Sequence, residues 1–143
     1  RFWEVFHDVE SPRERAAATY LYDDAESFIC DIDAPVGVVT HCQPYLTAPV
    51  LDRLDIRDWF DTVVCCSDET GWKPDPTPVE LAMTDLGVAH NGHEGVLAGD
   101  DPDDVGAAWN AGLDAIHVER YDPDERGQCV LGDRRVRGFE ELS

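Results

Sequence analysis

Residues 96–112 read VLAGDDPDDVGAAWNAG, and this stretch decides the fold. Its apolar beginning is typical of a buried strand, which we place over residues 94–100. Aspartates and a proline follow, as at the start of a helix, and Gly112 is a typical stop at a helix C-terminus. A buried strand that passes directly into a helix is the repeating unit of a parallel α/β sheet.

The rest of the chain repeats this unit. Apolar, β-branched runs predict further strands over 36–40, 61–66 and 114–120. The other expected elements are a helix beginning at Ser11, a short helix over 20–29, a helix over 44–56 that Pro49 should kink or delay, a helix over 76–87, and an edge strand with a terminal turn after Tyr121. The alternation predicts an α/β domain whose parallel sheet is covered on both faces.

The chain is strongly acidic. It has 31 Asp and Glu against 11 Lys and Arg, a formal net charge of −20, and its only lysine is Lys73. Such a surface repels nucleic acid and anionic lipid, so we expect neither a nucleic acid nor a membrane as a partner. An acidic, lysine-poor surface is typical of a very salty cytoplasm, where charges are strongly screened. We therefore expect a cytoplasmic, haloarchaeal protein, the alternative being a merely acidic protein.

The five cysteines fit neither a disulfide framework nor a zinc site. Their number is odd, and no two have C-x-x-C spacing. Cys30, Cys65 and Cys66 lie in apolar runs and are expected to be small core residues in a reduced protein. Cys42 has no accompanying base, so we expect it only to line the site described next.

Polar side chains follow three of the predicted strands. Because the carboxyl ends of parallel strands meet at one edge of a sheet, we expect these side chains to converge there. In order along the chain, they are Thr40, His41, Lys73, Asp100, Asp101 and Asp104. Lys73 supplies a compact positive charge in a chain that otherwise uses arginine, which indicates a site that needs a small cation.

The aspartates predict a Mg²⁺ site. Asp100 and Asp104 lie about one helical turn apart, and Mg²⁺ binds a few carboxylates while keeping several waters. Asp100 and Asp101 end an apolar strand, where their burial would require a cation. Alternatively, the acids only stabilise the start of the following helix, where negative charge is favoured. That alternative explains Asp103 and Asp104, but not Gly-Asp at the strand end.

Three segments in order, VVT (38–40), KPDP (73–76) and GDDPDDVGAAWNAG (99–112), resemble the second, third and fourth motifs of the haloacid dehalogenase (HAD) superfamily. The likeness covers roughly residues 19–120 and is phosphoglycolate-phosphatase-like. It implies a HAD-like Rossmannoid three-layer sandwich over 19–143, with the first strand missing and residues 1–18 as the remnant of an α-helical cap.

The resemblance also implies roles for the site residues. Thr40 and His41 would bind phosphoryl oxygens together with Lys73, which would also orient the nucleophile as a catalytic residue. The implied Mg²⁺ ligands are Asp100 and Asp104, with Asp101 contributing.

Two other pairs of candidate residues lie at the wrong end of the sheet. Asp31 and Asp33 look like the D-x-D nucleophile motif of the superfamily, but they precede the strand that Thr40 ends. About five residues at ~3.3 Å each separate the two positions by more than ~15 Å, too far to act on one phosphorus atom. His90 and His93 precede a strand in the same way and are expected to be exposed.

The favoured function is that of a HAD-type hydrolase. In the intact superfamily this means Mg²⁺-dependent hydrolysis of a small phosphorylated metabolite through an aspartyl-phosphate. No D-x-D motif stands at a suitable strand end, so we expect this chain alone to be inactive. The open sheet edge left by a missing strand would permit self-association.

Three alternatives stay open. The first is a non-catalytic, degenerate HAD-fold protein with residual Mg²⁺ or phosphate binding. The second is a 2-haloacid dehalogenase, which the paired acids disfavour because that chemistry needs no metal. The third is a receiver-like phospho-acceptor domain, disfavoured because Lys73 precedes the acidic cluster.

Overall fold

A computed structural model describes residues 21–88, 95–118 and 132–142. The predicted cap remnant over 1–18, together with His90, His93 and Cys129, lies outside the described residues. The elements in chain order are α3 (Asp23–Asp31), β1 (Gly37–Thr40), α4 (Pro44–Leu54), η1 (Arg57–Trp59), β2 (Thr62–Cys65), α5 (Thr77–Asp85), β3 (Val96–Gly99), α6 (Pro102–Asn110), β4 (Asp114–Val118), β5 (Arg134–Val136) and η3 (Phe139–Leu142).

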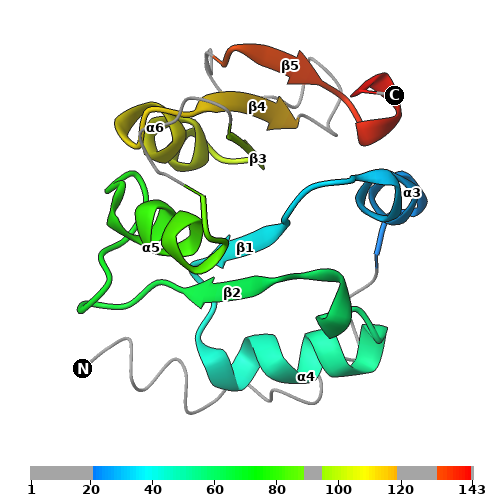
Figure 1. Ribbon diagram of the computed structural model, residues 1–143, viewed down its shortest axis with the longest axis horizontal. Coiled ribbons are helices and arrows are strands. Elements are labelled where there is room, and N and C mark those ends of the chain that lie inside the picture. The colour runs from blue at the N-terminus through cyan, green and yellow to red at the C-terminus, as the bar shows by residue number, and fades with distance from the viewer. Residues whose placement is uncertain (1–20, 89–94, 119–131, 143) are drawn as a thin grey trace.

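The strands form two parallel groups (Figure 1). In the β1–β2 pair, Thr40 lies beside Cys65. In the β3–β4–β5 sheet, Gly99 lies beside His117, and β5 is the edge strand predicted in the tail. The expected α/β fold with parallel strands is confirmed. Within the described residues, however, no ladder joins β1 to β3, so the expected single sheet is two groups.

The sides of β1 and β3 that face away from β2 and β4 are open in the described part of the chain. Alternate residues of a parallel strand direct their main-chain groups to opposite sides. The Thr40 carbonyl accepts a hydrogen bond from the N–H of Cys66, the residue after β2 (2.7 Å). The main-chain N–H and C=O of Val39 therefore point away from β2. The Gly95 carbonyl accepts a hydrogen bond from the Asp114 N–H of β4 (3.3 Å). The main-chain N–H and C=O of Val96 therefore point away from β4. Val96 is 55% exposed, although parallel strands normally bury valine.

A cluster of buried hydrophobic side chains joins the two groups. Helix α5 packs on β1 and β2, and α6 packs on β3 and β4. Val39 of β1 and Leu97 of β3 both contact the same buried cluster. The members of this cluster are Val79, Met83, Val105, Ala107, Ala108, Ala111, Leu113 and Ala115. Side chains from α5 and α6, rather than hydrogen bonds between strands, therefore hold the halves together.

Helix α6 starts and stops where its sequence predicts. The Asp101 carboxylate accepts a hydrogen bond from the Asp103 N–H (2.9 Å), and the Asp104 carboxylate accepts one from the Asp101 N–H (3.1 Å). These reciprocal bonds form a capping box, with Pro102 at the first helical position. At the other end Gly112 has φ +78°, a left-handed conformation that glycine adopts without strain.

Two local details differ from the prediction. Pro49 does not delay its helix, because α4 begins at Pro44 and continues through Pro49 to Leu54. Cys30 is exposed on α3 rather than buried, whereas Cys66 is fully buried as expected.

The described ends of the chain pack together on the far side of the fold from the Thr40 end of β1 (Figure 1). Phe28 of α3 stacks on Phe139 of η3 with ring centroids 5.0 Å apart. The Asp24 carboxylate also accepts a hydrogen bond from the Phe139 N–H (2.7 Å). Among the described residues, no helix is long and apolar enough to cross a membrane.

Candidate functional site

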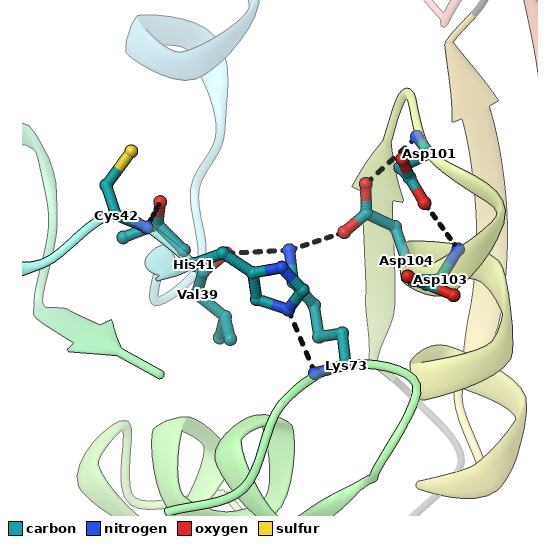
Figure 2. A network of polar contacts seen from close by, with 8 residues as sticks. Val39, His41, Cys42, Lys73, Asp101, Asp103 and Asp104 are labelled. Atoms are coloured by element: carbon teal, nitrogen blue, oxygen red, sulfur yellow. Dashed lines mark hydrogen bonds and ion pairs between the residues drawn. The ribbon is translucent and has the colours of Figure 1, made fainter. Parts of the chain in front are cut away.

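Lys73 lies at the centre of the candidate site and connects the two strand groups (Figure 2). Its ammonium donates to the Val39 carbonyl of β1 (3.2 Å) and to the Asp104 carboxylate of α6 (2.5 Å). The Lys73 and Asp104 side chains are only 11% and 10% exposed. The predicted convergence of Lys73 and Asp104 at the strand ends is therefore observed, as a largely buried ion pair.

Asp104 is held by contacts on both carboxylate oxygens. Oδ1 faces Lys73, and Oδ2 accepts the Asp101 N–H bond of the capping box. The side chain lies directly against Gly99, where an added Cβ atom would come within 2.2 Å of Oδ2. Gly99 is thus required by the position of Asp104, which explains the glycine at the strand end.

Helix α6 also holds the loop that carries Lys73. The Asn110 side-chain amide donates to the Pro74 carbonyl (3.0 Å). Gly106 lies beneath the same proline, so that an added Cβ atom would be 2.9 Å from the Pro74 Cβ. Sequence reasoning missed both contacts, because they join positions more than 30 residues apart. The only signal was the Asn-Ala-Gly end of the fourth motif.

Thr40 and His41 leave β1 at the same edge. The Thr40 hydroxyl oxygen accepts a hydrogen bond from the Cys42 N–H (3.1 Å), which leaves its proton available for a ligand. The His41 ring is exposed, and its Nε2 accepts a hydrogen bond from the Lys73 N–H (3.0 Å). Both residues lie where a phosphate site was predicted, but His41 is already engaged by the protein.

The aspartates differ from one another more than their spacing predicts. Asp100 and Asp101 are exposed, so the expectation that they are buried was wrong. Asp101 is the N-cap of α6, a role that the sequence had suggested for its neighbours. Asp100 accepts a hydrogen bond from the His117 Nε2–H through its main-chain oxygen (3.1 Å), and its carboxylate makes no hydrogen bond or ion pair within the described residues.

This donor set fits Mg²⁺ only as a partial site. Asp100 offers a solvent-facing carboxylate, and Asp104 is within the same turn but is engaged on both oxygens. No group of three His, Cys, Asp or Glu side chains that could hold a metal occurs within the described residues. Mg²⁺ can bind through one or two carboxylates plus waters and substrate phosphate, so Asp100 fits a metal that binds together with its substrate.

Cys66 lies beneath Lys73 but is not a nucleophile. Its side chain is fully buried, and burial raises the pKa of the thiol, while the Lys73 N–H and charge act in the opposite direction. A buried, protonated thiol is unreactive. Cys42, on the exit loop of β1, is half-buried; its main-chain N–H donates to the Thr40 hydroxyl, and its C=O accepts a hydrogen bond from the Thr47 hydroxyl.

The D-x-D pair lies far from these groups along β1. Asp31 is the last residue of α3, and Asp33 lies in the exposed link that enters β1. Thr40 is at the opposite end of that strand. The prediction that this pair does not belong to the site agrees with these positions.

Together, the fold and site define a parallel α/β protein with a buried Lys–Asp pair at the carboxyl ends of its strands. Over residues 4–118 the sequence matches the family of haloacid dehalogenase-like hydrolases. The chain therefore belongs to the haloacid dehalogenase-like hydrolase family.

Known proteins with similar sequences include phosphoglycolate phosphatases. Those of Escherichia coli (strain K12) and Yersinia pestis are each 33% identical over 82 residues. The match covers 57% of this chain and 32% and 34% of those two proteins, respectively. The matched segment thus spans about a third of these relatives.

Solved structures show the same fold. A HAD phosphatase from Thermococcus onnurineus superposes with a TM-score of 0.80 at 26% identity, over 99% of this chain and 66% of that one. L-2-haloacid dehalogenase from Xanthobacter autotrophicus has a TM-score of 0.71 at 19% identity, over 85% of this chain and 58% of its own, a likeness of fold alone.

Proposed function

We propose that the site is the phosphate- and Mg²⁺-binding part of a phosphohydrolase acting on a small phosphate monoester. The observation that carries this proposal is the Lys73 ammonium, held between α6 and the end of β1, the strand whose last residue is Thr40. The phosphoglycolate phosphatases among its relatives support a small phosphorylated metabolite as the substrate class.

Each residue has a distinct part in this proposal. Lys73 places a fixed positive charge at the strand ends, where it would attract phosphoryl oxygens and hold a carboxylate nucleophile. The Thr40 hydroxyl would donate to one phosphoryl oxygen. Asp100 would hold Mg²⁺, which supplies charge neutralisation to the phosphate when bound, and Asp101 and Asp104 keep the start of α6 beside it.

The nucleophile is the missing part of the site. An aspartyl-phosphate requires an aspartate near Lys73 and Thr40, and within the described residues Asp31 and Asp33 lie at the other end of β1. The open sides of β1 and β3 leave room in the hydrogen-bonding pattern for a further parallel strand. We propose that such a strand, or a second copy of the chain, pairs there and that only a strand ending in aspartate completes catalysis.

An assay of this chain with an aryl phosphate and Mg²⁺ tests this proposal. We expect no turnover above the background rate, but we expect calorimetry to detect phosphate binding in the presence of Mg²⁺. Sustained Mg²⁺-dependent turnover would show that the chain supplies its own nucleophile and that the missing-nucleophile proposal is wrong. If neither ligand binds, the site itself is wrongly assigned.

A degenerate, non-catalytic HAD protein is the second candidate. It is favoured by the partial metal site, in which Asp104 is engaged on both carboxylate oxygens and the described residues contain no group of three potential metal ligands. The two candidates differ when a parallel strand ending in aspartate is supplied, as a peptide or a fusion. A phosphohydrolase gains turnover, whereas a degenerate protein gains at most stability.

We propose a salty cytoplasm as the setting. The support is the net charge of −20 with a single lysine. Carboxylate repulsion of this size destabilises a compact chain unless salt screens it. The urea midpoint should therefore rise as KCl is raised from 0.1 to 3 M. An unchanged midpoint would favour an ordinary acidic protein.

A further inference from the structure

His41 makes an unusual contact for a residue in a phosphate-binding position. Its Nε2 atom accepts the hydrogen bond of the Lys73 N–H at 3.0 Å, although the ring is exposed. An acceptor nitrogen must carry a lone pair, so the ring proton resides on Nδ1 and the imidazole is neutral. An imidazolium has donors on both nitrogens and could not form this bond.

With this contact, two hydrogen bonds connect the end of β1 to Lys73 (Figure 2). The Val39 carbonyl accepts from the Lys73 ammonium, and two residues later His41 accepts from the Lys73 main chain. The opposite side of the loop is held by α6, through Asp104 and Asn110. Because no ladder joins β1 to β3 in the described residues, these bonds set the position of Lys73 relative to Thr40.

Trp72 restrains the ring of His41. The two rings meet edge to face, with centroids 5.4 Å apart and an interplanar angle of 74°. The Trp72 Nε1–H donates to the Asp68 carboxylate (3.1 Å), which fixes the indole in turn. Because these contacts restrain the ring, His41 is placed to accept one specific hydrogen bond rather than only to add charge to the surface.

We propose that His41 is a positioning residue, a neutral acceptor that fixes the Lys73 main chain to the exit of β1, and not a cationic phosphate ligand. Its effect on phosphate affinity rests on the proposed function, but the bond to Lys73 does not. The two roles demand different replacements. A positioning role needs an uncharged acceptor, which His41→Gln retains, whereas a charge role needs a cation, which His41→Arg retains.

The single lysine makes the contact directly measurable. Selective ¹⁵N-lysine labelling yields one main-chain amide signal, that of Lys73. We expect its hydrogen exchange to be several-fold faster in His41→Ala and His41→Arg, roughly the three- to tenfold effect of losing one net hydrogen bond. His41→Gln should exchange within about twofold of the wild type, as expected if most of that hydrogen bond is retained. Similar thermal unfolding midpoints in the three variants would exclude a general loss of structure.

Phosphate titration of the same samples, with Mg²⁺ present, gives the second readout. We expect His41→Gln to bind like the wild type, and His41→Ala and His41→Arg to bind more weakly. Unchanged Lys73 exchange in His41→Ala, or phosphate binding retained by Arg and lost by Gln, would overturn the positioning role. If the wild type binds no phosphate but the exchange pattern holds, the positioning role stands and the proposed function fails.

Discussion

The Lys73–Asp104 ion pair should be among the most costly contacts to break. Its two side chains are 11% and 10% exposed, and its N···O distance is 2.5 Å. Removing one member of a buried pair leaves an uncompensated charge, at a cost of roughly 3–5 kcal/mol. We take the lower end, about 3 kcal/mol, because Lys73 keeps the Val39 carbonyl as a partner.

The test is urea unfolding at constant high KCl, for Lys73→Met, Asp104→Asn and the double variant. Each single variant should lose about 3 kcal/mol, or roughly 6–12 °C in thermal midpoint for a chain of this size. The double variant should lose less than the sum of the two, with a coupling of about 2 kcal/mol.

A control is the exposed pair Arg57–Asp52, whose side chains are 51% and 67% exposed at an N···O distance of 3.0 Å. Asp52→Asn should cost about 0–1 kcal/mol. If Asp104→Asn lowers the free energy of unfolding by no more than Asp52→Asn does, burial does not make the Lys73–Asp104 pair more costly to break, and the reasoning is refuted.

Three further predictions concern Gly99, Asp133 and the cysteines. Gly99→Ala should destabilise the fold by about 1–3 kcal/mol and move Asp104, because its new Cβ would lie 2.2 Å from that carboxylate. The control is Gly87→Ala in the same unfolding assay. A Cβ at Gly87 meets no atom within 4 Å, but the residue has φ +74°, so this variant shows the cost of backbone strain alone. The Asp133 carboxylate accepts hydrogen bonds from the Ala115 N–H and the Trp109 indole, which lower its pKa in the folded protein. The stabilisation by the Asp133 carboxylate is therefore complete above the unfolded pKa of ~3.9 and is lost as the pH falls through the lower folded pKa. The difference in unfolding free energy between wild type and Asp133→Asn should shrink below about pH 4 and stay constant at pH 6–8. Alkylation followed by peptide mass spectrometry should label exposed Cys30 rapidly and Cys66 only on unfolding, since burial raises the pKa of Cys66; equal native labelling rates would contradict this account.

Local signals in the sequence predicted the elements well. The capped start and glycine stop of α6 are both present, as is the end of β1 at Thr40. Lys73 and Asp104 also meet as expected, because both follow strands of parallel sheets whose carboxyl ends share one edge.

The sequence-based predictions failed where the structure depends on contacts between residues far apart in the chain. The His41–Lys73 and Asn110–Pro74 bonds join residues 32 and 36 positions apart, and no local periodicity reports such contacts. Apolar runs likewise predict strands without indicating which strands pair, so the separation of β1 from β3 was not foreseen. Asp101 was expected to be buried, but as the N-cap it bonds its own helix and faces solvent.

We propose that Lys73, Thr40 and Asp100 form one site for phosphate and Mg²⁺. Titrating phosphate into the ¹⁵N-lysine-labelled chain, with and without Mg²⁺, tests it through the Lys73 amide signal. We predict a saturable shift that requires Mg²⁺, is lost in Asp100→Asn and is retained in Asp103→Asn, a matched charge change in the same turn. An unshifted Lys73 signal, or equal responses of the two aspartate variants, would show that these residues do not form such a site.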